Sequence, residues 1–161
     1  MGALLKKALQ WRLLVFVLVV ATFNLVPAWH DTTWLLERPN WTSVDRVLFR
    51  TFGGFASWDG EHFLAIARDG YVAEKQHAFF PLLPMLMHGA TSVVMRLQGS
   101  SVIVHRVPVL LGVGTVICNL AFLMSVLVFR RLSHTVLRNK EAAEKAALLY
   151  ALTPAGVFMS A

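Results

Sequence analysis

Residues 107–129 read VPVLLGVGTVICNLAFLMSVLVF, a stretch of 23 residues without one charged side chain. About 20 consecutive apolar residues are enough for a helix to cross a bilayer. The whole chain agrees with a membrane location, because 57% of its residues are hydrophobic, only 15% are charged, and its mean hydropathy is +0.60. The sequence therefore predicts an integral membrane protein. The high pI of about 10.1 does not indicate nucleic-acid binding, since no basic patch is interleaved with polar residues and no nucleic-acid motif occurs.

Two further apolar runs extend this pattern, one over 11–29 and one over 146–161. The run at 11–29 follows basic residues and also fits a cleaved signal peptide, but its length and poor cleavage region favour an uncleaved anchor. A fourth stretch, 79–95, is short and contains two prolines, a histidine and a glycine. We expect 11–29, 107–129 and the incomplete run 146–161 to be spans of a single all-α, polytopic module over 1–161.

Positive charge is concentrated in two short segments. Residues 1–12 hold three Lys and Arg side chains and residues 130–145 hold five, whereas 30–106 holds seven basic and seven acidic side chains. Because basic loops stay in the cytosol, we expect 1–12 and the loop 130–145 to be cytosolic and 30–106 to be one long lumenal or extracellular segment. Residues 79–95 then form a juxtamembrane or re-entrant helix. The rival topology makes 79–97 a true span and puts 130–145 in the lumen.

The tripeptide Asn40-Trp41-Thr42 agrees with a lumenal location of this segment. It is an N-glycosylation sequon, a pattern that also occurs often by chance. We therefore expect Asn40 to be a glycosylation site.

A polar cluster, Trp58-Asp59-Gly60-Glu61-His62-Phe63, lies inside the predicted lumenal segment. Charged groups this close to a bilayer are costly and usually functional. The spacing of apolar residues over 59–71 predicts a short amphipathic helix, which Gly70 would end. Asp59 would then lie at or near the N-cap, where its carboxylate either caps the helix or acts as a general base.

The neighbours of Asp59 leave similar alternatives open. His62 lies three residues on, so it points to the same side of the first turn and either orients a phosphate or sugar hydroxyl or bonds the backbone. Glu61 is a favourable first-turn acid, and with Asp59 it is also a weak candidate for a divalent metal. Arg68 either faces solvent or pairs with a lipid phosphate.

A second aromatic and proline-rich stretch follows the predicted helix. Phe79 and Phe80 either anchor the chain at the interface or line a groove for a long isoprenoid, and Pro81 fits the first turn of a helix. His88 lies alone in an apolar stretch and is more typical of a packing histidine than of a ligand.

These blocks resemble a known family. The matching residues are Trp58-Asp59-x-x-His62-Phe63, Ile66-Ala67, Gly70-Tyr71, His77-Ala78-Phe79-Phe80-Pro81-Leu82-x-Pro84 and the final stretch 152–161. In order and spacing they are similar to the GPI mannosyltransferase 2 (PIG-V) family, which belongs to the GT-C class of glycosyltransferases. The resemblance implies a GT-C-like N-terminal module whose long first lumenal loop carries an acidic residue and juxtamembrane helices.

The resemblance also implies an activity. It is that of a multi-pass enzyme of the endoplasmic reticulum membrane, which transfers the second mannose, α-1,6, from dolichyl-phosphate-mannose to the GPI intermediate without a metal or other cofactor. Asp59 would be the catalytic base. The implied substrate-binding residues are Trp58, Glu61, His62, Arg68, Lys75, His77, Phe79 and Phe80. The implied partners are the donor lipid, the GPI glycolipid, the membrane and a small membrane subunit.

One departure from the family keeps two alternatives open. Family members are about three times longer, so we expect the chain by itself to lack the spans that hold donor and acceptor. The first alternative is a non-catalytic membrane fragment that serves assembly or regulation. The second is another GT-C transferase that uses a dolichol-phosphate sugar.

Overall fold

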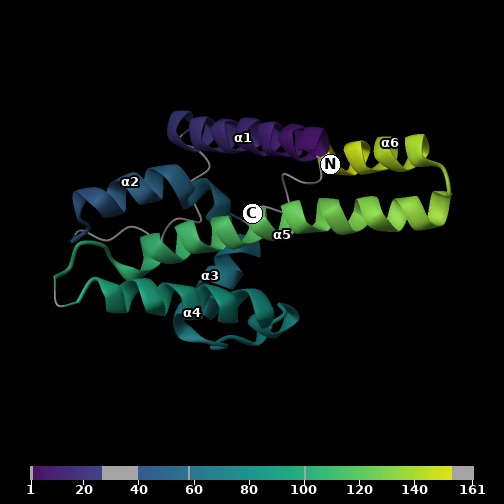
Figure 1. Ribbon diagram of the computed structural model, residues 1–161. Helices are drawn as coiled ribbons and strands as arrows, with labels where there is room; N and C mark the ends of the chain where they lie inside the picture. The colour runs from purple at the N-terminus through teal and green to yellow at the C-terminus, as the bar shows by residue number, and fades with distance from the viewer. Residues whose placement is uncertain (1, 27–39, 58, 100, 154–161) are drawn as a thin grey trace. The chain divides into compact units, whose positions relative to one another are not determined.

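The computed structural model describes residues 2–26, 40–57, 59–99 and 101–153, and these contain helices and no strand. In chain order the helices are α1 (Gly2–Leu25), α2 (Ser43–Phe52), the 3-10 helix η2 (Gly53–Ala56), α3 (Asp59–Asp69), the 3-10 helix η3 (Glu74–Ala78), α4 (Leu82–Leu97), α5 (Arg106–Leu137) and α6 (Lys140–Ala151), as Figure 1 shows. Two of them, α1 and α5, are long and apolar enough to cross a membrane by length and composition. The prediction of an all-helical chain with apolar spans is confirmed to that extent.

The helices extend beyond the predicted spans. α1 begins at Gly2, well before residue 11, and α5 continues past residue 129 to Leu137. The segment 130–145, predicted as a loop, is therefore mostly helical, and only Arg138 and Asn139 separate α5 from α6. These differences have one cause: charged residues mark where a helix leaves the apolar layer, but Lys, Arg and Glu are good helix formers and do not end it. Of the predicted third span, residues 146–151 lie in α6 and residues 154–161 lie outside the described part of the chain.

The chain divides into two compact units. The first contains the described residues 2–18 and 117–153, and its core is formed by apolar side chains of α1, α5 and α6. These are Leu4, Ala8, Phe122, Val126, Ala147 and Ala151. The guanidinium of Arg12 lies 3.6 Å from the centre of the Phe122 ring, a cation–π contact that allows a charged group to be buried among apolar ones. Tyr150 stacks on Phe129, with ring centroids 4.6 Å apart, and its hydroxyl lies 2.9 Å from that of Ser125.

The second unit contains residues 19–116 and includes α2, η2, α3, η3 and α4 with the adjoining ends of α1 and α5. In this unit, η2 packs closely against the end of α1 because two of its residues are glycines. A Cβ atom on Gly53 would lie 2.6 Å from the Phe23 ring, and one on Gly54 would lie 2.8 Å from Val19. Only a residue without a side chain lets η2 lie this close to the end of α1. This contact positions α2 and α3, which precede and follow η2.

α4 has 16 residues and is shorter than the helices that pass as candidate spans. At 1.5 Å per residue it is about 24 Å long, less than the roughly 30 Å of a bilayer's hydrocarbon layer. Pro81 lies just before its first residue, as its fixed backbone angle and missing N–H favour. The non-spanning assignment of 79–95 fits this length and stays a prediction.

Candidate functional site

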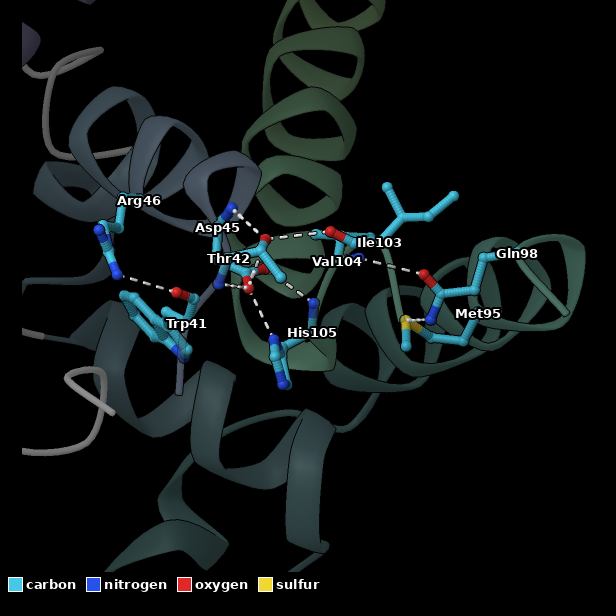
Figure 2. Close-up of polar contacts among 9 residues, drawn as sticks. All are labelled: Trp41, Thr42, Asp45, Arg46, Met95, Gln98, Ile103, Val104 and His105. Carbon is cyan, nitrogen blue, oxygen red and sulfur yellow. Dashed lines mark hydrogen bonds and ion pairs between the residues drawn. The ribbon is translucent and has the colours of Figure 1, made fainter. Parts of the chain in front are cut away.

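The predicted lumenal segment is closed by a buried hydrogen-bond network between its two ends (Figure 2). Thr42 caps α2: its hydroxyl accepts from the Asp45 backbone N–H at 3.2 Å, while the Asp45 carboxylate accepts from the Thr42 backbone N–H at 2.7 Å. The same carboxylate accepts from the backbone N–H of His105 at 2.7 Å and from the ring Nδ1 of His105 at 2.6 Å. Asp45 is fully buried. We call Thr42, Asp45 and His105 the end clamp, because they join residues sixty positions apart.

The charge of Asp45 depends on these bonds. Burial opposes a charged carboxylate, but the hydrogen bonds from His105 and Thr42 outweigh it and hold the pKa of Asp45 below its ordinary value. Gln98 supports the clamp from one side, since its side-chain oxygen accepts from the Val104 backbone N–H at 3.2 Å. The end clamp therefore holds the start of α2 next to the start of α5, and η2, α3 and α4 lie between these two points in the chain.

Helix α3 forms as the sequence predicts. Its apolar stripe is buried at Leu64, Ile66 and Ala67, and the helix ends at Asp69. Gly70 follows with φ at +81°, a left-handed conformation that suits glycine and terminates helices. The predicted helix from residue 59 and its stop at Gly70 are therefore confirmed, but the helix ends at Asp69 and does not include Tyr71.

Asp59 is the first residue of α3 and its side chain is exposed. Among the described residues its carboxylate has no hydrogen bond and no ion pair, so the capping bond that the sequence left open is not found there. The Gly60 backbone N–H instead donates to the Ser57 carbonyl at 3.1 Å. An acid in the first turn still meets the positive end of the helix. The carboxylate thus faces solvent without a competing partner, as a base that acts on a bound hydroxyl requires. Trp58 lies outside the described residues.

Glu61 has a different environment from Asp59. It is half-buried, and its Oε1 atom is out of contact with solvent and has no hydrogen-bond partner among the described residues. Burial raises the pKa of Glu61, and the nearby charges of His62 and Lys75 offset part of that rise. No group of three His, Cys, Asp or Glu side chains in the described residues is placed to hold a metal ion.

An aromatic group joins α3 to the stretch after it. The ring of His62 lies 4.7 Å from that of Phe79, and Phe63 meets the same ring edge-on at 5.2 Å. Tyr71 packs on His77 at 5.0 Å and donates its hydroxyl to the Phe79 carbonyl at 2.7 Å. Phe79 is thus the common partner of His62, Phe63 and Tyr71, which the sequence singled out separately or left aside, and Tyr71 adds His77 to the group.

The loop that carries Lys75 and His77 is held by Gln76, which is buried. Its side-chain oxygen accepts from the backbone N–H groups of Val72 and Ala73 at 2.8 and 2.9 Å. No sequence pattern predicts this role, because a single glutamine in a polar stretch carries none.

The other predicted site residues lie apart from this group. Arg68 donates from Nε to the Asp69 carboxylate at 2.7 Å, so its charge is already paired. Phe80 is 79% exposed and makes no ring contact among the described residues, which fits interfacial anchoring better than a groove wall. Asn40 is exposed, but the hydroxyl of Thr42 in its sequon is part of the end clamp. A glycan on Asn40 would therefore have to be attached before the clamp forms.

A second polar contact that the sequence did not predict joins α3, α4 and α5. His88 Nδ1 lies 2.8 Å from the Ala67 carbonyl, and Arg106 Nη2 lies 3.0 and 3.3 Å from the two ring nitrogens of His88. His88 is therefore satisfied by hydrogen bonding, as predicted, but its side chain is exposed and not packed in a core. A capping-box pattern, Thr42-x-x-Asp45, was available in the sequence and would have revealed half of the end clamp. No comparable pattern announces the partners of His105 or Arg106.

Comparison with known proteins completes the description of the site. The family model described as Mannosyltransferase (PIG-V) matches residues 1–161. The GPI alpha-1,6-mannosyltransferase 2 of Rattus norvegicus is 36% identical over 160 residues, which cover 98% of this chain and 32% of the relative. The human protein of the same name is 31% identical over 158 residues, again covering 98% of this chain and 31% of the relative.

More distant relatives agree with these two. The GPI mannosyltransferase 2 of Drosophila melanogaster is 27% identical over 161 residues, covering 97% of this chain and 35% of the relative. No solved structure matches the chain. The chain spans about a third of the length of the curated relatives that it matches. Because the family model matches this chain from residue 1 to residue 161, the chain belongs to the PIG-V mannosyltransferase family.

Proposed function

We propose that this chain provides the part of a GPI mannosyltransferase that carries the catalytic base, and that Asp59 is this base. The observation that carries the proposal is the exposed carboxylate of Asp59 at the first turn of α3, inside the blocks that resemble the family. The names of the relatives support a transfer of mannose in GPI synthesis. The donor would be dolichyl-phosphate-mannose, and the acceptor the first mannose of the GPI intermediate.

The reaction would be a single inverting displacement. The 6-hydroxyl oxygen of the acceptor attacks the anomeric carbon of the donor mannose, and the bond from that carbon to the phosphate oxygen breaks. Asp59 accepts the proton that the hydroxyl loses, and dolichyl phosphate leaves without needing a proton. The arrangement parallels inverting glycoside hydrolysis, with a sugar hydroxyl in place of water.

The leaving phosphate needs positive charge near it. Lys75 and His62 are the best candidates, because both act electrostatically on Glu61 in the first turn of the same helix. Arg68 is a weaker candidate, since Asp69 already holds its guanidinium. Glu61 favours its neutral form relative to an ordinary glutamate, which would allow it to donate a hydrogen bond to a sugar oxygen.

The membrane topology belongs to the same proposal. α1 and α5 would cross the endoplasmic reticulum membrane. The basic segments 1–12 and 130–145 would be cytosolic, and residues 30–106 would lie in the lumen. The short length of α4 and the neutral charge balance of 30–106 support this arrangement. The small membrane partner subunit remains an implication of the family resemblance.

A chimera tests the proposal. Residues 1–161 replace the matching part of the rat GPI alpha-1,6-mannosyltransferase 2, and the chimera is expressed in cells that lack that enzyme. We expect GPI-anchored proteins to return to the cell surface with the unsubstituted chimera and with Glu74→Gln, which changes an exposed acid on η3. We expect no return with Asp59→Asn.

Two results would count against the proposal. Full rescue by Asp59→Asn would remove Asp59 from the chemistry. Failure of a well-expressed unsubstituted chimera would favour the non-catalytic membrane module instead. Mass analysis of the lipid intermediates distinguishes another dolichol-dependent transferase, because the GPI intermediate with one mannose accumulates only if the second transfer is blocked.

A further inference from the structure

His105 and Arg106 are adjacent in the chain and bond in two different directions. His105 belongs to the end clamp and holds the buried carboxylate of Asp45 with both its backbone N–H and its ring. Arg106 Nη2 contacts both ring nitrogens of His88 and donates, at 3.3 Å, to the hydroxyl of Ser92, both on α4. One dipeptide at the start of α5 therefore ties the beginning of α2 to the middle of α4.

His88 carries the connection one step further, to α3. Its Nδ1 lies 2.8 Å from the carbonyl of Ala67, which is among the last carbonyls of that helix and has no partner within it. A carbonyl only accepts hydrogen bonds, so Nδ1 must carry the hydrogen. Arg106 Nη2 lies 3.0 Å from Nδ1 and 3.3 Å from Nε2 of His88, so the guanidinium packs against the imidazole beside this bond. Arg106 thus limits how the His88 ring can turn while its Nδ1 donates to Ala67.

These bonds act on the helix that carries Asp59. Apolar packing of Leu64, Ile66 and Ala67 holds α3 in place, but apolar contacts are not directional and tolerate rotation or sliding. The hydrogen bond from His88 is directional and reaches the opposite end of α3 from Asp59. At the other end, η2 connects α3 to α2 and so to the end clamp.

We propose that Arg106 and His88 are positioning residues, which set the orientation of α3 and thereby the placement of the Asp59 carboxylate against the acceptor hydroxyl. This inference rests on the proposed function. Neither residue touches a substrate. Misplacing a reacting group by about 1 Å lowers the rate of transfer roughly 100-fold without changing how well the substrate binds elsewhere.

The kinetic test uses the purified rat chimera, a short-chain polyprenyl-phosphate-mannose as donor and a synthetic GPI glycan with one mannose as acceptor. We expect His88→Leu and Arg106→Met to lower kcat about 100-fold with KM changed less than about 3-fold. We expect His88→Asn to recover most of kcat, because its amide can donate to the Ala67 carbonyl. His134→Leu is the matched control, since His134 lies on the part of α5 in the other unit.

A structural measurement on the 161-residue chain in detergent accompanies the kinetics. Amide hydrogen exchange over residues 66–72 should be faster in His88→Leu than in His88→Asn or the unsubstituted chain. Unchanged exchange in His88→Leu, or equal loss of kcat in the Leu and Asn variants, would overturn the positioning role while leaving Asp59 as the base. An inactive unsubstituted chimera would overturn the proposed function and this inference together.

Discussion

Replacing Asp45 by asparagine should loosen the end clamp. The amide has one oxygen where the carboxylate has two. With that oxygen in the place of Oδ2, the bonds from the Thr42 backbone and the His105 ring survive in weaker, uncharged form, but the amide NH₂ then faces the His105 backbone N–H. If the amide is turned the other way, the bond from the His105 backbone N–H survives, and the bonds from the Thr42 backbone and the His105 ring are lost.

The cost follows from the hydrogen bonds that change. One partly buried backbone donor left unpaired costs about 1–3 kcal/mol, and two bonds that lose their charge lose roughly 1 kcal/mol each. The total is about 3–5 kcal/mol, and its lower end corresponds to roughly a 100-fold change in an equilibrium constant, since 1.4 kcal/mol is about tenfold. Loss of the bond from the Thr42 hydroxyl to the Asp45 carboxylate adds little to this cost. The hydroxyl can donate instead to the Ile103 carbonyl, which lies 3.0 Å away.

Hydrogen exchange of the α2 amides, measured on the whole chain in detergent micelles, reports this local opening. We expect the amides of residues 45–49 to exchange about 100-fold faster in Asp45→Asn. Asp69→Asn is the matched control: the same substitution at an exposed carboxylate, whose pair with Arg68 contributes at most about 1 kcal/mol. If the α2 amides of Asp45→Asn exchanged within about threefold of the unsubstituted chain, the clamp would not hold α2.

The pH dependence gives an independent check with a defined sign. The pKa of Asp45 is lower in the folded chain than its ordinary value of 3.8, so the folded state binds fewer protons there than the unfolded state. The stabilisation is therefore complete above that ordinary value and is lost as the pH falls through the lower, folded pKa. The difference in opening free energy between the unsubstituted chain and Asp45→Asn should shrink below about pH 4. A difference that grows on acidification would contradict the assigned charge state.

Three further changes have defined outcomes. Gly54→Ala should lower the melting temperature, because its Cβ would lie 2.8 Å from Val19 and overpacking costs about 1–3 kcal/mol, whereas Gly89→Ala, with nothing within 4 Å in a helix interior, should raise it. Hydrogen bonds from Arg130 and His134 lower the pKa of Glu144 from 4.5 to about 2. Glu144 should therefore stabilise the packing of α6 above pH 4.5 and lose that effect towards pH 2. Glu144→Gln should remove this pH dependence from thermal unfolding curves. Expression in sealed microsomes should give a product that glycosidase shortens and that Asn40→Gln lacks; an unshifted product would remove the predicted glycan.

Local patterns predicted the parts of the structure that depend on near neighbours. The α3 helix, its end at Gly70 and the long α5 helix follow from periodicity, glycine and an uncharged run, all of which act within a few residues. The contacts that hold the site do not. Asp45 and His105 are sixty positions apart and Ala67 and His88 are twenty-one apart, so their pairing is decided by how the helices pack. The sequence shows which of these side chains can bond, but the choice of partner is a property of the fold.

The carboxylates Asp45, Asp59 and Glu61 each lie in the first turn of a helix, but their surroundings give them different roles. Asp45 uses both oxygens on partners of the fold, so it has no capacity left for a substrate. Glu61 has one oxygen that is shielded and has no partner among the described residues, and burial raises its pKa. Asp59 is exposed and has no partner among the described residues. A base for the transfer must be accessible and uncommitted, and of the three only Asp59 meets both conditions.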